Sequence, residues 1–340
     1  MPSQPPLPPL LAPYVSSLPD ASLTLVSSIL GATSNWLVLR FLHAALSSQS
    51  ASTFGADDLQ NGIKKKVVLV SFMRSYEFWK TEAKRLGLDL TRLAEKHQFA
   101  FIDGLSELFY AQSPPPTSSP GMGSSPRTTL PMRGPTGAVP GRAPQPTAPV
   151  GTMGNPAAKQ EPGIAKKLHF SGRGLASLDA MEKDIASVIE QQKTQMEEGD
   201  ELVLIIDQPD LLLATTGPSM GIGATEISEW ITGLQQHAHA TIVTLATDTP
   251  LIHNASGLGG QLATPIESEH AAFAIGLAHR ARSVMQLRTL ETGAAKDVSG
   301  VLRISRGGGL GTGEDNLEER EALYFIQRDG GVTVFGRGES

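Results

Sequence analysis

The sequence predicts an α/β fold with a mostly parallel central sheet, helices on both faces and an antiparallel edge near the C-terminus. Two observations carry this prediction. Short apolar runs alternate with segments in which apolar residues recur at helical spacing, as they do in chains that build parallel sheets. After residue 283 the helical spacing stops, and several alternating segments follow one another, which is typical of antiparallel strands at a sheet edge.

The predicted strands of the parallel part are continuous apolar runs. They cover residues 23–29, 67–72, 99–103, 201–207 and 240–247. A parallel strand is buried on both faces, so its residues need not alternate between apolar and polar. The edge strands are residues 283–290, 300–305 and 324–335, and we expect the last of these to bend at Gly330 and Gly331.

The predicted helices lie between these strands. They begin near residues 36, 78, 90, 178, 225 and 269. Gly87 and Gly199 are typical of helix ends, because glycine adopts the left-handed conformation that often terminates a helix. Asp89 and Thr225 stand where a side-chain oxygen can cap the first turn of the helix that follows.

The chain has 340 residues, but Gly, Pro, Ser and Thr dominate residues 112–166. Because no apolar period runs through this segment, it cannot bury enough surface to offset its ordering entropy, and we interpret it as a disordered insertion. Residues 1–13 are also rich in Pro and are expected to form an extended tail. The two remaining pieces each hold too few strands to close a sheet, so residues 14–340 are predicted to form one domain around the insertion.

Composition and charge exclude several classes of protein. The absence of cysteine excludes disulfides and thiolate zinc sites. No apolar run is long enough to cross a bilayer and no secretory signal opens the chain, which predicts an intracellular protein. The cytoplasm is the favoured compartment, and the nucleus is the alternative. The net charge of −6 argues against binding nucleic acid through bulk charge, but it permits a local contact or one shared with partner subunits.

The connection after the first strand has the layout of a phosphate-binding loop without its residues. The pattern is Gly, four residues, Gly, Lys and Ser/Thr. If Gly31 opens it, Trp36 stands at the second Gly. Leu37 and Val38 then stand at the Lys and the Ser/Thr, and no other register helps, because the first lysine of the chain is Lys64. A phosphate site needs small residues, a cation and a hydroxyl for magnesium, so this loop is predicted to be degenerate.

Nucleotide hydrolysis needs acidic residues near strand ends, to hold magnesium and to orient a water molecule. Asp207 ends a strongly apolar strand, at the position of the carboxylate that holds magnesium in phosphate-loop enzymes. With no working loop beside it, we interpret Asp207 as a polar residue at a strand end that caps the following loop. Residues 71–75 carry no acid to orient a water molecule, and Glu77, inside the next helix, is interpreted as a surface glutamate.

Arg303 and Arg306 lie on or just past an edge strand. In ring-shaped nucleotide hydrolases a comparable strand offers an arginine to the phosphates held by the neighbouring subunit. The two residues are therefore candidates for a contact in trans or for a contact with RNA. Arginines on an edge strand are also found simply solvated, and that alternative stays open.

Three further sequence patterns contain residues that are found in active sites, metal sites or RNA-binding sites. Residues 217–221 match Gly-x-Ser-x-Gly with Ser219 as the nucleophile, but no strand leads directly into this turn, so we regard the match as chance. His237 and His239 have no third ligand near them in the sequence, and no metal site is predicted. Lysines 64–66 and 166–167 either attract RNA phosphates or are solvated residues beside hydrophobic strands.

Four segments, taken together and in order, resemble the Elongator complex protein 6 family. They are residues 31–36, 67–79, 84–90 and 297–304. The resemblance covers nearly the whole chain outside the tail and the insertion. It implies a RecA-like fold without working nucleotide motifs, and assembly with Elongator proteins 4 and 5, two copies of each, into a six-membered ring.

The resemblance also implies that the ring binds tRNA and assists the Elongator complex in modifying the wobble uridine, with nucleotide hydrolysis by the ring modulating tRNA release. Residues 208–224 and 249–266 would line the central pore, yet they contain no lysine or arginine, which leaves backbone amides, hydroxyls and His253 for RNA. We therefore expect a non-catalytic ring subunit without a cofactor. The alternatives are a degenerate nucleotide-binding protein that holds an anion near Thr33 and Ser34, or a serine hydrolase that uses Ser219.

Overall fold

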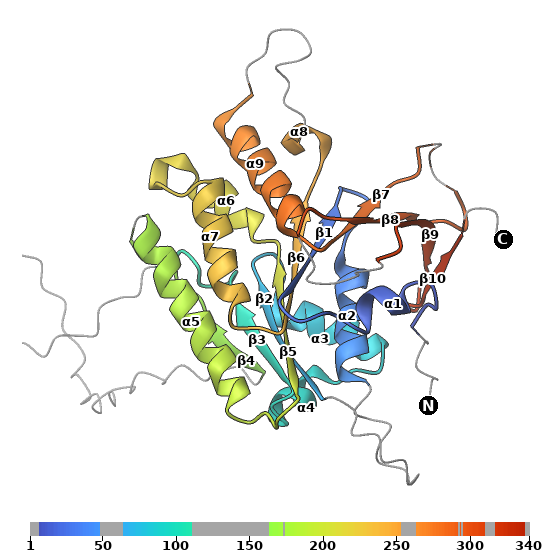
Figure 1. The fold of residues 1–340 in the computed structure, drawn as a ribbon, viewed down its shortest axis with the longest axis horizontal. Helices are drawn as coiled ribbons and strands as arrows, with labels where there is room; N and C mark the ends of the chain where they lie inside the picture. Colours follow the sequence, from blue (N-terminus) through green and yellow to red (C-terminus); the bar gives the residue numbers. More distant parts are fainter. Residues whose placement is uncertain are drawn as a thin grey trace, which may run out of the picture. The chain divides into compact units, whose positions relative to one another are not determined.

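The structure is a computed structural model that describes residues 7–47, 64–110, 163–172, 174–252, 263–291, 293, 295–309 and 317–336. Within these residues ten strands form one sheet in the order β10-β9-β8-β7-β1-β6-β5-β2-β3-β4 (Figure 1). The pairs from β7 through β1, β6, β5, β2 and β3 to β4 are parallel. The pairs from β7 to β10 are antiparallel. The predicted α/β fold with an antiparallel C-terminal edge is confirmed.

The elements have the following bounds. The strands are β1 (Ser22–Ser28), β2 (Lys65–Ser71), β3 (Phe99–Asp103), β4 (Ile164–Lys167), β5 (Glu201–Asp207), β6 (Ala240–Ala246), β7 (Ser283–Arg288), β8 (Gly300–Arg306), β9 (Arg320–Ile326) and β10 (Val332–Phe335). The helices are α1 (Ala12–Val15), α2 (Asn35–Leu46), α3 (Tyr76–Arg85), α4 (Leu90–Glu95), α5 (Leu175–Lys193), α6 (Asp210–Thr216), the 3-10 turn η2 (Pro218–Met220), α7 (Ala224–Gln235), α8 (Thr249–Ile252) and α9 (Pro265–Arg280).

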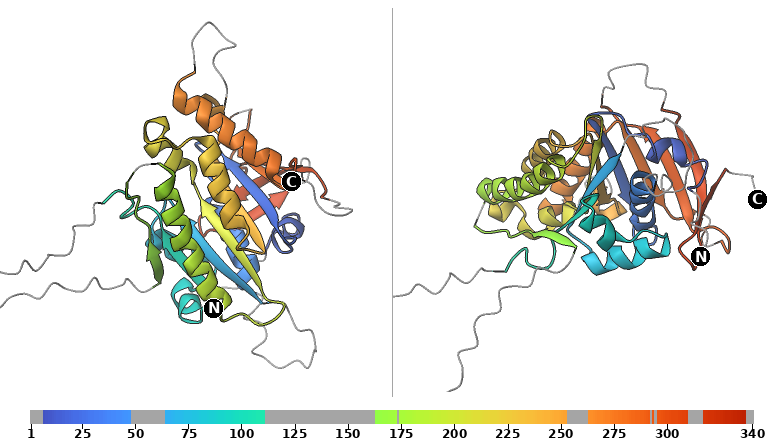
Figure 2. Two further views of the ribbon diagram at one scale, coloured as in Figure 1. Left: turned by 60° about the vertical axis from the view of Figure 1, so that its left-hand side comes forward. Right: turned by 90° about the horizontal axis from the view of Figure 1, so that it is seen from below.

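Helices cover both faces of the sheet (Figure 2). On one face α2, α3 and α4 pack against a core that includes Val67 and Leu69 of β2. On the other face α5, α6, α7 and α9 pack against a core that includes Val68 and Val70 of the same strand. Successive side chains of a strand point to opposite faces, so one apolar run supplies both cores. This double burial explains why the parallel strands appear in the sequence as continuous apolar segments.

The first residues that the structure describes are packed, not extended. Leu11 is fully buried, and its N–H donates to the carbonyl of Pro8 at 2.9 Å. Tyr14 and Val15 of α1 are buried as well. The expectation of an extended tail over residues 1–13 is therefore wrong from residue 7 onward, because apolar side chains in this stretch complete a core. Residues 1–6 lie outside the described residues.

The predicted disordered insertion also ends earlier than expected. We placed its end at residue 166, whereas β4 begins at Ile164 and pairs in parallel with β3, with Asp103 opposite Lys167. Two of the four residues of β4 are lysines, which is common on an edge strand and hides the strand from a search for apolar runs. Strands on both sides of the segment belong to the same sheet, and residues 111–162 lie outside the described residues.

The last predicted strand, residues 324–335, is two strands. A tight turn separates β9 from β10, and in it Gln327 N–H donates to the carbonyl of Gly331 at 2.8 Å. Gly330 adopts a φ of +89°, which favours glycine and lets the chain reverse there. None of the helices in the described part of the chain combines the length and apolar character that a bilayer-spanning helix needs.

Candidate functional site

The connection from β1 to α2 is closed by hydrogen bonds within the chain. Ala32 N–H donates to the carbonyl of Ile29 at 2.9 Å, and Gly31 between them has a φ of +93°, as a type II turn requires. Leu30 N–H donates to the carboxylate of Asp248 at 2.8 Å. In a phosphate loop such amides point at the anion. Here two of them are bonded to other groups of the chain, and one of those groups is itself negative.

The three positions that correspond to Gly, Lys and Ser/Thr of the phosphate pattern are buried. Leu37 and Val38 are fully buried, and Trp36 is 6% exposed. The indole of Trp36 packs against the ring of Tyr324 in β9, with 4.8 Å between ring centroids. Burial raises the pKa of Tyr324 to about 12, so its hydroxyl keeps its proton. These side chains hold the hydrophobic core together and bring no charge to a phosphate.

The strand order brings the ends of four strands to one edge of the sheet. In the parallel register Ser28 of β1 lies opposite Ala246 of β6. Asp207 of β5 lies opposite Thr244 of β6 and, on its other side, opposite Ser71 of β2. The carboxyl edge of a parallel sheet is where ligands of such folds bind. The β1–α2 connection and Asp207 therefore share the edge where a nucleotide would lie.

Asp207 is fully buried, and donors from three parts of the chain surround its carboxylate. The Ser71 hydroxyl donates to Oδ2 at 2.8 Å, and the Thr244 hydroxyl donates to Oδ1 at 2.9 Å. Arg74 Nη1 lies 3.3 Å from Oδ1 and 3.2 Å from Oδ2. Each carboxylate oxygen thus already accepts two hydrogen bonds, although a metal-binding carboxylate must present free lone pairs to the ion.

The guanidinium group of Arg74 stands next to the Asp207 carboxylate. Burial raises the pKa of Asp207, while the Arg74 charge and the hydroxyls of Ser71 and Thr244 act in the opposite direction. Arg74 also lies over the ring of Phe78, 5.5 Å from its centroid. We expected Asp207 to cap the following loop, and this is wrong: the next amide donates to the Thr244 carbonyl, and Asp207 instead links β2, β5 and β6.

A second buried carboxyl group, Asp210, begins α6. Its Oδ2 accepts a hydrogen bond from Ala246 N–H at 3.3 Å. Burial is the main cause that raises the pKa of Asp210 to about 7; the nearby charge of Asp207 acts in the same direction, and the hydrogen bond from Ala246 N–H acts against it. Asp210 was not among the predicted site residues, because residues 208–224 were interpreted as a loop, whereas α6 and η2 occupy much of that segment.

Two candidates for acid–base or nucleophilic chemistry lie in ordinary surface settings. The Glu77 side chain is largely exposed and pairs with Lys80 at 3.2 Å. Ser219 is exposed in η2, between two helices, and its hydroxyl donates to the carbonyl of Thr216 at 3.3 Å. The Gly-x-Ser-x-Gly pattern works on a turn from a strand into a helix, and this segment follows a helix.

The two histidines considered as metal ligands have separate partners. His237 Nδ1 lies 3.5 Å from Glu190, while His239 Nδ1 lies 3.1 Å from Asp20. Within the ranges that the structure describes, no three His, Cys, Asp or Glu side chains are grouped so that they could hold a metal ion. Of the second predicted pore loop, α8 and the start of α9 are described, and His253 lies outside the described residues.

The two arginines proposed for a contact in trans lie at different positions along β8. β8 is antiparallel to β7, so Arg306 pairs with Ser283 at the amino end of β7, the opposite edge of the sheet from Asp207. Arg306 Nε donates to the carbonyl of Leu317 at 3.2 Å. Arg303 is exposed in the middle of β8. The structure does not bring Arg306 and Asp207 together within one chain.

The five lysines considered for RNA phosphates all bind groups of this chain. The pairs are Lys64 with Glu197, Lys65 with Glu201, Lys66 with the carbonyls of Gln192 and Gln195, Lys166 with Asp184, and Lys167 with Glu107. Lys66 is nearly buried and binds the last turn of α5, where cations are favoured. These contacts support a structural role for the lysines beside their strands.

Comparison with known proteins identifies the fold. No protein-family model matches the sequence, and no curated protein matches it. Among solved structures, the KaiC-like protein PH0186 of the hyperthermophilic archaeon Pyrococcus horikoshii OT3 is similar, with a TM-score of 0.51 and 11% identity over 98% of this chain and 97% of that chain. At this identity the similarity concerns the fold alone. The fold is RecA-like α/β, as predicted.

Proposed function

We propose that this chain is a non-catalytic subunit of a RecA-like hetero-hexameric ring, formed with Elongator proteins 4 and 5. In this proposal the ring binds tRNA and assists the Elongator complex in wobble-uridine modification, in the cytoplasm or the nucleus. The sequence resemblance supplies the partners. The observation that carries the non-catalytic role is the buried Asp207 carboxylate, whose lone pairs are taken by Arg74, Ser71 and Thr244.

Hydrolysis of a nucleoside triphosphate needs three groups that the described residues do not place at the carboxyl edge in usable form. A cation must cradle the outer phosphates, and Leu37 stands in its position. A carboxylate must help to hold magnesium, and Asp207 is bound to Arg74 instead. An acid must orient water, and residues 71–75 contain none. The architecture of a nucleotide hydrolase is kept, which fits a subunit that holds its neighbours in place.

Exposed apolar side chains support a protein partner at the carboxyl edge. Leu30 is 87% exposed after β1, Met73 is 47% exposed after β2, and Leu105 is 44% exposed after β3. Phe109 and Tyr110 follow and are also exposed. Large exposed apolar side chains that gather at one edge mark interaction surfaces. This edge is therefore the surface that we assign to a neighbouring subunit.

Native mass spectrometry of the chain co-expressed with Elongator proteins 4 and 5 tests the proposal. We expect a six-membered assembly with two copies of each protein. The double variant Leu30→Asp/Met73→Asp should shift the population toward smaller species, because charges would be buried at the interface. The matched control Ile326→Asp, on the exposed side of β9, should leave assembly unchanged. An assembly of Elongator proteins 4 and 5 that forms without this chain would contradict the proposal.

A further inference from the structure

The side chain of Arg40, in the middle of α2, is buried although it carries a charge. It is 1% exposed, and burial lowers the pKa of its guanidinium, which still keeps its proton at neutral pH. Arg40 Nη2 donates to the carbonyl of Gly330 in the β9–β10 turn at 3.1 Å. Nε and Nη1 of the same side chain are also buried, and neither finds an acceptor in the described part of the chain. Most of the N–H groups of this cation are therefore unpaired.

No carboxylate of the described residues forms an ion pair with Arg40. The other well-covered arginines differ in this respect: Arg74 pairs with Asp207 at 3.2 Å, and Arg288 pairs with Glu321 at 2.6 Å. A buried charge without a counter-charge is strongly destabilising. The carbonyl of Gly330 accepts one hydrogen bond but brings no negative charge. The surroundings of Arg40 therefore favour an anion.

His43 presents a second unpaired nitrogen on the same side of α2. Residues three apart on a helix are neighbours, and His43 is 7% exposed. Burial is the main cause that lowers the pKa of His43, and the charge of Arg40 acts in the same direction, so the imidazole is neutral at pH 7. His43 Nδ1 lies 3.4 Å from the Ser47 hydroxyl, while the buried Nε2 has no partner among the described residues. With the Ser47 hydroxyl donating to Nδ1, the proton sits on Nε2. Both residues then offer donors only, which is the chemistry that binds an anion.

The space beside Arg40 is enclosed, which limits the size of the anion. Helix α2 is buried on most of its surface, and Leu39 and Leu42 next to Arg40 are 6% and 0% exposed. A Cβ at Gly330 would lie 3.6 Å from Cβ of Arg85 in α3, so the β9–β10 turn packs on α3 as well as on α2. A phosphate that belongs to a nucleotide or to RNA would need a path to solvent here. A monatomic anion such as chloride needs none and has no fixed geometry to satisfy.

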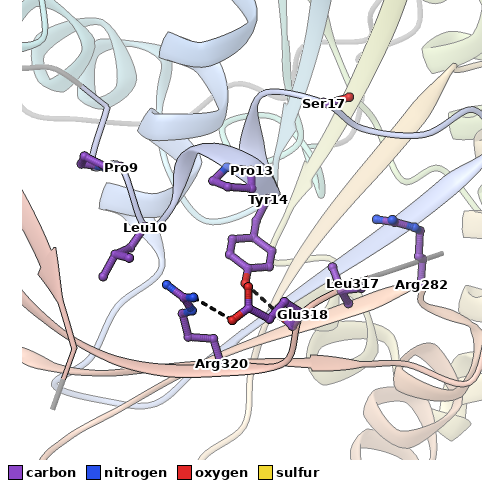
Figure 3. A pocket seen from close by; sticks show the side chains of 9 residues that line it. All are labelled: Pro9, Leu10, Pro13, Tyr14, Ser17, Arg282, Leu317, Glu318 and Arg320. Atoms are coloured by element: carbon purple, nitrogen blue, oxygen red, sulfur yellow. Dashed lines mark hydrogen bonds and ion pairs between the residues drawn. The ribbon is translucent and has the colours of Figure 1, made fainter.

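The pocket of about 240 Å³ beside α1 and β9 does not compete as an anion site (Figure 3). Its two arginines, Arg282 and Arg320, lie on opposite sides of Glu318 and Leu317 (Figure 3). Arg320 Nη2 donates to Glu318 Oε1 at 2.7 Å, and Arg282 also has a partner within the chain. The unpaired positive charge of Arg40 is the feature that points to a ligand.

We propose that Arg40 and His43 bind a chloride ion enclosed between α2 and the β9–β10 turn. The ion accepts hydrogen bonds from Arg40 Nε and Nη1 and from His43 Nε2, and it neutralises the guanidinium. Because Arg40 also binds the Gly330 carbonyl, the ion stabilises the packing of the β9–β10 turn on α2. The inference goes beyond the proposed ring function, since it requires no nucleotide, RNA or partner subunit.

Thermal unfolding of the full-length chain in mixtures of sodium chloride and sodium gluconate tests the proposal. The sodium concentration is held constant, and gluconate is too large for the enclosed site. The unfolding temperature should rise by roughly 3–5 °C for each tenfold increase in chloride above the dissociation constant, because the ion binds the folded state. Arg40→Met, which keeps a side chain of similar length without the charge, should remove this rise. Arg92→Met on exposed α4 should retain it and so corrects for general salt effects.

Crystals of the wild-type chain grown with sodium bromide in place of chloride locate the ion without any variant. Anomalous scattering should show a bromide within hydrogen-bonding distance of Arg40 Nη1 or Nε and of His43 Nε2. An ordered water molecule at that place in the presence of bromide would overturn the proposal. An unfolding temperature that depends on chloride equally in the wild type and in Arg40→Met would also overturn it, as would one that does not depend on chloride at all.

Discussion

Replacement of Arg74 by Met removes the guanidinium from Asp207 and keeps an apolar side chain beside Phe78 and Trp79. The carboxylate then stays fully buried with only the hydroxyls of Ser71 and Thr244 as donors. A buried charge that loses its partner is a strongly destabilising arrangement. We therefore expect the variant to fold but to be less stable than the wild type.

The size of the effect follows from the geometry. Arg74 Nη1 lies 3.2 Å from Asp207 Oδ2, and the two side chains are 16% and 0% exposed. At an effective dielectric constant of about 20, two unit charges roughly 4 Å apart attract each other by about 4 kcal/mol. Removal of one partner of a buried pair costs about 3–5 kcal/mol. Because Arg74 retains some contact with solvent, we expect a loss of about 2–4 kcal/mol for Arg74→Met near pH 7.

Urea denaturation followed by circular dichroism measures this loss. Arg92→Met, the same substitution on the exposed side of α4, should change the unfolding free energy by less than about 0.5 kcal/mol. Adding Asp207→Asn to Arg74→Met should recover part of the loss, with a coupling of at least about 1 kcal/mol.

The pH dependence has a definite sign. Burial raises the pKa of Asp207, and Arg74 lowers it, so the folded-state pKa rises further in Arg74→Met. A carboxyl group that keeps its proton longer in the folded state than in the unfolded state makes stability fall as pH rises. The variant should therefore lose more stability than the wild type between pH 5 and pH 8. A variant within about 0.5 kcal/mol of the wild type at both pH values would refute the reasoning.

Two further predictions concern buried polar groups. The pKa of Asp210 is raised to about 7 in the folded state, so ionisation of this carboxyl group lowers stability at any pH above its ordinary pKa. Asp210→Asn should therefore gain stability relative to the wild type as the pH rises from 4 to 7, and the difference should stay constant above pH 7. Thermal unfolding at several pH values measures this. A variant curve parallel to that of the wild type would contradict this. Lys66→Met leaves the carbonyls of Gln192 and Gln195 at the end of α5 without their donor and should cost about 1–3 kcal/mol in urea unfolding. Lys64→Met should cost less, because the pair of Lys64 with Glu197 is exposed to solvent. Equal losses in the two variants would count against the capping role of Lys66.

The fold was predictable because the parallel strands are buried on both faces. A short continuous apolar run such as Glu-Leu-Val-Leu-Ile-Ile-Asp in β5 indicates a parallel strand that is buried on both faces. The edge strands are indicated by the alternation of apolar and polar residues. The short strand β4 was not predicted, because two of its four residues are the lysines Lys166 and Lys167 and it therefore has no apolar run. The helix α6 (Asp210–Thr216) was missed because residues 208–224 were interpreted as a single loop.

The candidate site could be predicted only in part. The lack of the second glycine and the lysine in the phosphate loop can be recognised in the sequence, because the pattern has fixed spacing. The contact between Arg74 and Asp207 cannot be recognised in the sequence. It depends on β2 and β5 being neighbours in the sheet, although 133 positions separate the two residues. The same holds for Asp248, which lies beside Leu30 because β6 pairs with β1.

Equilibrium dialysis of the purified chain against labelled ATP with magnesium measures whether the degenerate site holds a nucleotide. We expect no saturable binding up to about 1 mM ATP, a limit that corresponds to about 4 kcal/mol of binding free energy. Saturable binding of one ATP per chain that requires magnesium and is lost in Asp207→Asn would contradict it, because the carboxylate that we assign to Arg74 would then be holding a metal ion.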